Sequence, residues 1–295
     1  MSNTISVSVS STKEPLLLNG PIPAVVTVAN ISSNVVSILL PYPNPNNLKF
    51  EGKPISSLVL KPVEYLENER STAIRINPGD GYTRRYFLNR YLKIIKPGTI
   101  TISYRLTIPL SVLTTGQRWT DTEFTGTFQI AAVDDSEDML RATLAQYAGT
   151  LKGADKQIQM EAAEALAFLD TPISVDYIEP MLAIEGLETT GIRSLARFPS
   201  QRTFSLITGM LSHRDSAVLS TALEAISRLN IPVQRVKIQR LLASDDPSIR
   251  LAGLEWLASH PDKEDLRFIA PLLDDSNRAV QDRAKLYADR LREMH

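Results

Sequence analysis

The stretch Asp246-Pro-Ser-Ile-Arg-Leu-Ala-Gly-Leu-Glu-Trp-Leu257 decides the fold of the second half of the chain, because its pattern recurs. The same spacing of apolar and small residues is found at 155–166, 184–195, 215–226 and 277–288. The apolar residues in the fourth position form a column with spacings of 29, 31, 31 and 31: Ile158, Leu187, Val218, Ile249 and Val280. Such regular spacing is typical of proteins that stack one structural repeat on the next.

Each of these stretches predicts an amphipathic helix. Counted from the column leader, every repeat has a small residue at offset 4: Ala162, Gly191, Ala222, Gly253 and Ala284. Offset 8 is apolar or small in every repeat: Leu166, Leu195, Ile226, Leu257 and Ala288. Offsets 0, 4 and 8 lie on one stripe of a helix, so we expect this stripe to be buried. The small residue at offset 4 indicates that a second helix approaches closely there.

The starts of these helices are also marked in the sequence. Asp155, Asp215, Asp246 and Asn277 stand three residues before their leaders, and these residue types are favoured N-caps. Ile184 takes this place in the repeat with the short spacing, so we expect that helix to begin differently. A second column, at 150–151, 181–182, 210–211, 241–242 and 272–273, marks the other helix of each pair. The sequence thus predicts five antiparallel helix pairs over residues 134–295, an all-α solenoid.

These repeats resemble the HEAT family, in particular the short HEAT-like repeats known from bilin-lyase-type proteins. The resemblance covers residues 135–295 and implies stacked helix pairs that enclose an extended concave surface. Their period of about 31 residues is shorter than the 40–47 of typical HEAT repeats. The Arg that often follows the column leader in that family is present once, as Arg250.

Residues 1–133 are predicted to form strands. Eight runs rich in β-branched and aromatic residues are separated by turn residues: 4–11, 23–29, 35–40, 55–60, 72–76, 82–88, 99–108 and 123–131. This spacing favours an antiparallel β-sandwich. The stretches 74–81 and 96–104, each with a Pro-Gly turn, resemble the late strands of bacterial immunoglobulin-like domains, which usually present loops or act as spacers. The predicted fold class is therefore multidomain β + α, with an Ig-like sandwich at 1–133 before the HEAT-like solenoid at 134–295.

Composition narrows the classes of function. With 32 Lys and Arg against 33 Asp and Glu, the chain does not favour a nucleic-acid partner. The net charge is +5 over residues 1–133 and −6 over 134–295, so the two regions either attract each other or each meet an oppositely charged partner. The absence of Cys excludes disulfides and thiolate catalysis. No apolar run is long enough to cross a bilayer and no signal peptide is visible, which predicts a cytoplasmic protein, or a periplasmic or secreted one if a signal peptide has been removed.

The sequence offers no candidate catalytic residue, cofactor site or metal site. None of the motifs G-x-S-x-G, G-x-G-x-x-G, Walker A and H-E-x-x-H occurs. His213, His260 and His295 lack neighbouring ligands at metal-binding spacing. We therefore predict a protein that is not an enzyme and carries no cofactor.

A candidate partner-binding surface lies at offsets 2, 6 and 9, which point away from the buried stripe and line the concave face of HEAT-like solenoids. The residues predicted to bind a protein or peptide there are Met160, Glu164, Arg193, Glu224, Leu251 and Glu255. They form either a shallow acidic groove or an ordinary solvated face. The basic run Arg84, Arg85, Arg90, Lys93 and Lys96 is likewise either a solvated face or a patch for an acidic partner.

The leading hypothesis is an interaction or scaffold protein, in which the solenoid binds the partner and the sandwich is a spacer or second contact. One version is an immunity or inhibitor protein that caps a toxin or enzyme. The alternative is a HEAT-like enzyme of the DNA glycosylase or lyase type. A glycosylase needs a basic concave face to hold phosphates, which a file of glutamates does not supply. A lyase needs a nucleophile or an acid–base pair, and none is identifiable.

Overall fold

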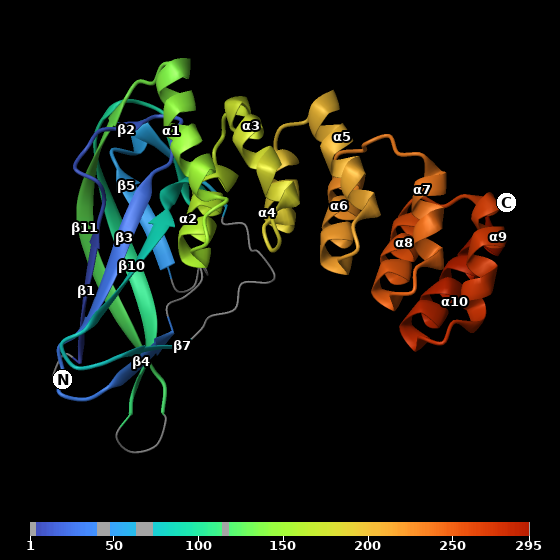
Figure 1. Ribbon diagram of the computed structural model, residues 1–295, viewed down its shortest axis with the longest axis horizontal. Coiled ribbons are helices and arrows are strands. Elements are labelled where there is room, and N and C mark those ends of the chain that lie inside the picture. Colours follow the sequence, from blue (N-terminus) through green and yellow to red (C-terminus); the bar gives the residue numbers. More distant parts are fainter. Residues whose placement is uncertain (1–3, 40–47, 63–72, 114–117, 295) are drawn as a thin grey trace. The chain divides into compact units, whose positions relative to one another are not determined.

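The computed structural model describes residues 4–39, 48–62, 73–113 and 118–294. Within these residues the strands β1–β11 come first and the helices α1–α10 follow, as predicted (Figure 1). The change falls between the last strand, β11 (Thr120–Val133), and the first helix, α1 (Glu137–Thr150). Leu40 and Thr72, at the ends of two predicted strands, and His295 lie outside the described residues.

The described strands form three sheets. The first is antiparallel, in the order β1 (Ile5–Ser10), β3 (Pro23–Asn30) and β8 (Gly81–Phe87). The second has the order β2 (Leu16–Leu17), β11, β10 (Gly98–Val112), β4 (Val36–Leu39) and β7 (Ala73–Ile76), and β5 (Leu48–Lys53) also pairs with β10. The third consists of β6 (Leu58–Leu60) and β9 (Leu92–Ile94).

The predicted strands differ from the observed ones in several places, and the short strands β2 and β9 lie outside every predicted run. Strand β5 was not predicted, although buried Leu48 and Phe50 alternate with exposed Lys49 and Glu51 in the expected period of two. The predicted strand 55–60 is wrong in its first half, because Ile55–Ser57 forms a 3-10 turn and only β6 pairs with another strand.

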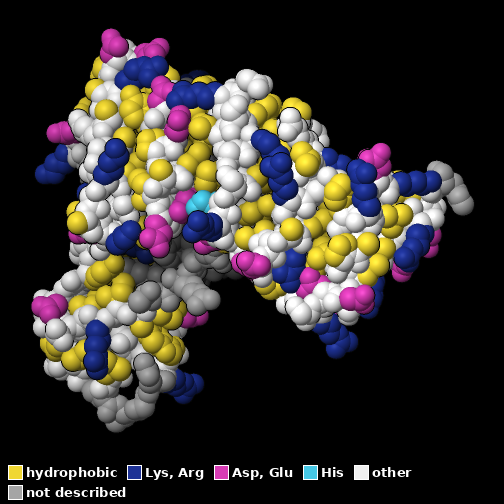
Figure 2. Space-filling model, turned by 45° about the vertical axis from the view of Figure 1, so that its right-hand side comes forward, with side chains coloured by type: hydrophobic (Ala, Val, Ile, Leu, Met, Phe, Trp, Pro, Cys, Tyr) yellow, Lys and Arg dark blue, Asp and Glu magenta, His cyan; other side chains and the backbone are white. Residues whose placement is uncertain are grey.

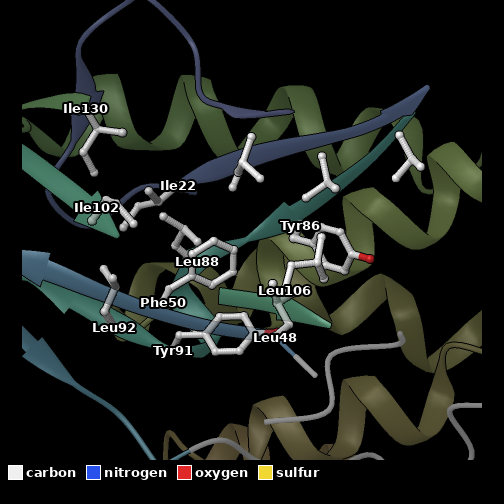
Figure 3. Packing of buried hydrophobic residues seen from close by; sticks show 14 of the residues in the cluster. Ile22, Leu48, Phe50, Tyr86, Leu88, Tyr91, Leu92, Ile102, Leu106 and Ile130 are labelled. Atoms are coloured by element: carbon white, nitrogen blue, oxygen red, sulfur yellow. The ribbon is translucent and has the colours of Figure 1, made fainter. Parts of the chain in front are cut away.

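Strands of all three sheets contribute to one hydrophobic core (Figure 3). Tyr86 of β8, Leu106 of β10 and Leu92 of β9 are completely buried in it. The rings of Phe50 and Tyr91 meet edge to face, with centroids 5.1 Å apart and planes at 68°, a favourable arrangement for aromatic pairs. Because the sheets share this core, displacement of any one sheet would expose apolar side chains of the other two.

The chain divides into two compact units, residues 1–177 and 178–295. The first unit contains α1 and α2 (Lys156–Ala167) in addition to the strands. Helix α2 contacts β8, and the ring of Tyr147 on α1 lies edge-on to Phe87 of β8, with centroids 5.7 Å apart. The first helix pair therefore packs on the sheet that contains β8.

In the second unit the longer helix of each pair packs beside that of the next pair. These longer helices are α4 (Glu188–Leu195), α6 (Ser216–Arg228), α8 (Pro247–Ser259) and α10 (Arg278–Glu293) (Figure 1). Each follows a short helix that continues as a 3-10 turn. These short helices are α3 (Val175–Ile178), which crosses the boundary between the units, α5 (Gln201–Gly209), α7 (Arg235–Gln239) and α9 (Leu266–Ile269). Each 3-10 turn contains the second column of the repeats and packs against the longer helix that follows it.

The buried stripe has the predicted register, with one exception. Leaders Leu187, Val218, Ile249 and Val280 are buried, as are all the residues at offsets 4 and 8. Ile158 is the exception, because 49% of it is exposed. Helix α2 packs against β8, and Gln159 and Ala163 are among its buried residues instead.

The structure also confirms the close approach at offset 4. A Cβ atom added to Gly253 would lie 3.2 Å from the Cβ of Leu241, and one added to Gly191 would lie 3.1 Å from the Cβ of Met181. The predicted N-caps Asp155, Asp215, Asp246 and Asn277 all accept hydrogen bonds from the first turns of their helices. Helix α4 begins differently, as expected, after Leu187 and without a side-chain cap.

Candidate functional site

The residues predicted to bind a partner are distributed over both units. In the first unit, α2 carries Met160, which is exposed, and Glu164, which is half-buried. In the second unit, Arg193 on α4 is half-buried and Glu224 on α6 is exposed. Helix α8 carries half-buried Leu251 and exposed Glu255.

Glu224 and Glu255 occupy equivalent positions on two helices that pack against each other. Axes of packed helices lie about 8–10 Å apart, so the potentials of the two carboxylates overlap within roughly one Debye length at physiological salt. Leu251 lies one turn before Glu255 on α8 and adds apolar surface beside them. Arg193 on α4, which packs against α6, is held next to them in the same way, so these four residues are the part of the predicted surface that lies on adjacent helices.

One part of the predicted face is wrong. Offset 9 was expected to point to solvent, but Ala167, Ala196 and Ala258 are buried. Within the second unit the cause is the next helix pair, because each longer helix contacts the one that follows it. In α10, after which the second unit has no further pair, offset 9 is the exposed Asp289. The solvated strip is therefore narrower than the sequence suggested, and offsets 2 and 6 carry it.

A row of arginine side chains on the same strip was not predicted. At offset 10, Arg228 and Arg290 are exposed and Arg197 is half-buried. These arginines share one offset of the repeat, so the 31-residue period could have revealed them as it revealed the other columns. Arg228 follows Glu224 by one turn on α6, so the strip has mixed charge. On the face shown in Figure 2, acidic and basic side chains are interspersed over the helical region.

The uneven charge of the two sequence regions is concentrated in the first unit. Residues 134–177 hold 9 acidic and 3 basic side chains, whereas residues 178–295 hold 16 of each. The acidic excess thus belongs to residues 134–177, which include α1 and α2 and are in the same unit as the net-positive strands. Glu161 of α2 lies 3.4 Å from Arg85 of β8, so part of this charge is matched inside the unit.

Lys61, immediately after β6, makes the most extensive of the polar contacts between strands and helices in the first unit. Its Nζ lies 2.6 Å from Oδ2 of Asp170 and donates to the carbonyl oxygens of Asn89, at 2.8 Å, and Phe168, at 3.1 Å. The guanidinium of Arg90 lies over the Phe168 ring, 5.0 Å from its centroid, and Arg90 is buried. The basic run of the sequence is therefore divided, because Arg90 is part of this contact and does not lie on a solvated face.

A buried polar cluster, which was not predicted, joins the last two repeats. Asp265 is completely buried and accepts hydrogen bonds from Arg235 Nε at 2.9 Å, Tyr287 Oη at 2.6 Å and Gln239 Nε2 at 3.2 Å. Burial alone would raise the pKa of Asp265, but the hydrogen bonds from Arg235, Tyr287 and Gln239 lower it below its ordinary value. Burial and the bond to Asp265 raise the pKa of Tyr287. Asp265 is thus a charged structural anchor without access to solvent.

Trp256 and His260 pack beside this cluster. Their rings stack with centroids 4.2 Å apart, and His260 Nδ1 lies 2.9 Å from the carbonyl oxygen of Trp256. Arg235 also donates to the carbonyl oxygen of His260, at 2.6 Å. The described residues contain no group of three or more side chains that could hold a metal ion. His260 is engaged in packing and hydrogen bonding.

Arg250 of α8 connects two repeats. It forms a bidentate pair with Asp275, at 2.8 and 2.7 Å, and also donates to the carbonyl oxygen of Ser244 at 2.8 Å. The hydrogen bond from Arg250 lowers the pKa of Asp275. Asp275 in turn accepts from the backbone N–H of Asn277, the N-cap of α10, so the pair fixes the start of the last helix.

Comparisons with known proteins give no family. No protein-family model matches the chain, and no curated protein matches it significantly. Among solved structures, an engineered protein is 18% identical over 51% of this chain and 80% of its own, with a TM-score of 0.33. A PapD-like domain of human CEP192 is 7% identical over 46% and 89%, with a TM-score of 0.25.

The Salmonella alpha-2-macroglobulin structure is 11% identical over 99% of this chain, with a TM-score of 0.25. This chain spans 27% of that protein's length. Scores this low carry no argument about fold or function. In the part of the chain that the structure describes, no helix is long and apolar enough to cross a membrane.

Proposed function

We propose that this chain is a non-enzymatic interaction protein of the cytoplasm, in which a short-repeat, HEAT-like solenoid binds a protein or peptide partner. The strands are proposed to form an Ig-like sandwich that acts as a spacer or second contact. The observation that carries the proposal is the row of packed helices α4, α6, α8 and α10, on which offset 6 is half-buried in α4 and exposed in the other three. Solenoids use such repeated, solvated positions to bind extended segments.

The mixed charge of this strip defines the partner. Glu224 and Glu255 favour basic groups, while Arg228 and Arg290 favour acidic ones, and Leu251 adds apolar contact. A segment that carries both charges in a matching order gains from each of these contacts and is selected over uniformly charged competitors. The partner is therefore an extended segment with both basic and acidic side chains, and a nucleic acid is disfavoured because unit 2 is neutral overall.

The experiment is a capture assay with the variant Glu224→Lys/Glu255→Lys. Both side chains are exposed, so the fold and its melting temperature should be retained. The variant should capture about tenfold less, or still less, of the partners that the wild type binds, and the capture that remains should depend less on salt concentration. The matched control is Glu185→Lys/Glu264→Lys, which changes the net charge equally at exposed positions outside the strip. If the first variant and the control capture the same partners equally, the strip is an ordinary solvated face.

A further inference from the structure

The third sheet carries a concentration of exposed apolar side chains. Of the ten large apolar residues that are exposed in the described part of the chain, four lie on or beside β6 and β9. They are Ile55, exposed by 78%, Val59 by 50%, Leu60 by 55% and Ile95 by 43%. Exposed apolar residues scattered singly need no explanation, but a group on one small sheet marks a site of interaction.

The strand register places Val59 and Ile95 on one face of this sheet, whereas Leu60, opposite Leu92, belongs to the other face. Val59 is opposite Lys93 and Leu58 is opposite Ile94, so the two faces of the sheet alternate. Leu58 and Ile94 are buried, whereas Val59 and Lys93 belong to the opposite, outer face. The backbone N–H of Ile95 donates to the carbonyl oxygen of Ser57 at 2.8 Å, which holds the 3-10 turn containing Ile55 beside Ile95.

Two lysines lie at this outer face. Lys93, which is half-buried, is on it, and exposed Lys96 follows Ile95 in the connection to β10. Within the described residues, neither of the two lysines has an ion-pair partner.

The other basic residues of the same sequence run are engaged. Arg85 pairs with Glu161, Arg84 lies over the Tyr86 ring at 5.1 Å, and Arg90 is buried against Phe168. Lys93 and Lys96 are therefore the part of the run that faces solvent without a carboxylate. From this arrangement we infer that Ile55, Val59 and Ile95, with Lys93 and Lys96, form a docking surface for an acidic protein segment with apolar side chains.

The chemistry of the surface specifies its occupant. Apolar side chains at the centre lose water on contact, and lysines at the rim attract carboxylates and orient the segment. An anionic membrane also combines apolar and acidic groups, but it is bound by broad basic faces with apolar residues that insert. Three short β-branched side chains on a small sheet offer too little apolar depth for that mode, which favours the protein segment.

Methyl NMR on the full chain labelled at Ile δ1 tests the inference. The probe is a short synthetic peptide of alternating Glu and Leu, with its Gln-for-Glu counterpart as control. The Glu peptide should shift the methyl signals of Ile55 and Ile95 and leave that of Ile31, which is 56% exposed and follows the end of β3, unchanged. Lys93→Glu/Lys96→Glu and Ile55→Ser should each weaken binding by about tenfold, whereas Ile31→Ser should not.

Several outcomes overturn the inference. If the Gln peptide binds as tightly as the Glu peptide, charge does not contribute to binding. If the signal of Ile31 shifts as much as those of Ile55 and Ile95, the peptide does not bind specifically at this surface. Sedimentation with phosphatidylserine vesicles that depends on Lys93 and Lys96, without peptide binding, assigns the surface to membranes. Glu224→Lys/Glu255→Lys should leave peptide binding unchanged, so this surface is tested independently of the proposed binding strip on α6 and α8.

Discussion

Nζ of Lys61 lies 2.6 Å from Oδ2 of Asp170, and this ion pair joins the residue after β6 to the segment that follows α2. The two partners are 109 positions apart in the sequence, and both side chains are mostly shielded, with 18% and 24% exposed. Together with the Phe87–Tyr147 ring contact, the pair makes the first helix pair a structural part of the first unit.

The first prediction concerns truncation. We expect residues 1–177 to give a fragment with a higher melting temperature than residues 1–133, because the shorter fragment exposes Phe87 and removes Asp170 and the Phe168 carbonyl, to which Lys61 binds. Circular dichroism melts and binding of a hydrophobic dye compare the two fragments. Residues 178–295 should be helical in the same assay. Equal melting temperatures and equal dye binding would show that α1 and α2 contribute nothing to the strands.

The ion pair itself can be tested by a double-mutant cycle with Lys61→Met and Asp170→Asn. We expect a coupling energy of about 1–2 kcal/mol, since a partly buried, charge-assisted hydrogen bond exceeds a surface pair. Urea unfolding of the four proteins gives the free energies of unfolding. The exposed pair Arg292–Asp289, at 2.8 Å, is the control and should show coupling near zero. Strictly additive effects at Lys61 and Asp170 would contradict the prediction.

The helices were predictable from the sequence because equivalent positions of the repeats have similar surroundings and therefore carry similar residues. The buried leaders Val218, Ile249 and Val280 each follow an Asp or Asn cap by three positions and precede an Ala or Gly by four. Ile158 broke the pattern because α2 packs against β8, a contact between residues far apart in the sequence. No periodicity encodes such a contact, which is also why the Lys61 contacts were missed.

The candidate site was predictable only in part, for the same physical reason. Helical angles correctly separated exposed Glu224 and Glu255 from the buried stripe. They could not show that the next helix pair covers Ala196 and Ala258, because that depends on how the pairs stack. The Asp265 cluster was not predicted because the partners of Asp265 come from two separate helices, α7 and α10.

The close approach at offset 4 predicts opposite effects of two glycine substitutions in the second unit. Gly253→Leu should destabilise by about 1–3 kcal/mol, because even its Cβ would lie 3.2 Å from Leu241 and Leu242. Gly209→Ala should be neutral or stabilising by up to about 1 kcal/mol, since a Cβ there meets open space and Ala is the better helix former. Thermal and urea unfolding measure both. A neutral Gly253→Leu would mean that the longer helix does not approach the 3-10 turn as closely as the structure shows.

The last prediction concerns the dependence of stability on pH. At about pH 7, Asp265→Asn should destabilise the protein by roughly 3–5 kcal/mol, because it leaves the Arg235 guanidinium without its buried counter-charge. Tyr287→Phe should cost less, about 1–3 kcal/mol, because it removes one of several donors to Asp265. Both free energies of unfolding come from urea titrations of the intact chain.

The sign of the pH effect follows from the lowered pKa of Asp265. A carboxylate whose pKa is lower in the folded state stabilises the fold at any pH above its unfolded pKa of about 3.9, and this contribution is lost as the pH falls toward the folded pKa. The difference in stability between wild type and Asp265→Asn should therefore be constant from about pH 7 to 5 and shrink below about pH 4. The control Asp289→Asn, exposed on α10, should show a small difference throughout. A gap that persists undiminished at about pH 2 would mean that the charge of Asp265 is not what holds the last two repeats together.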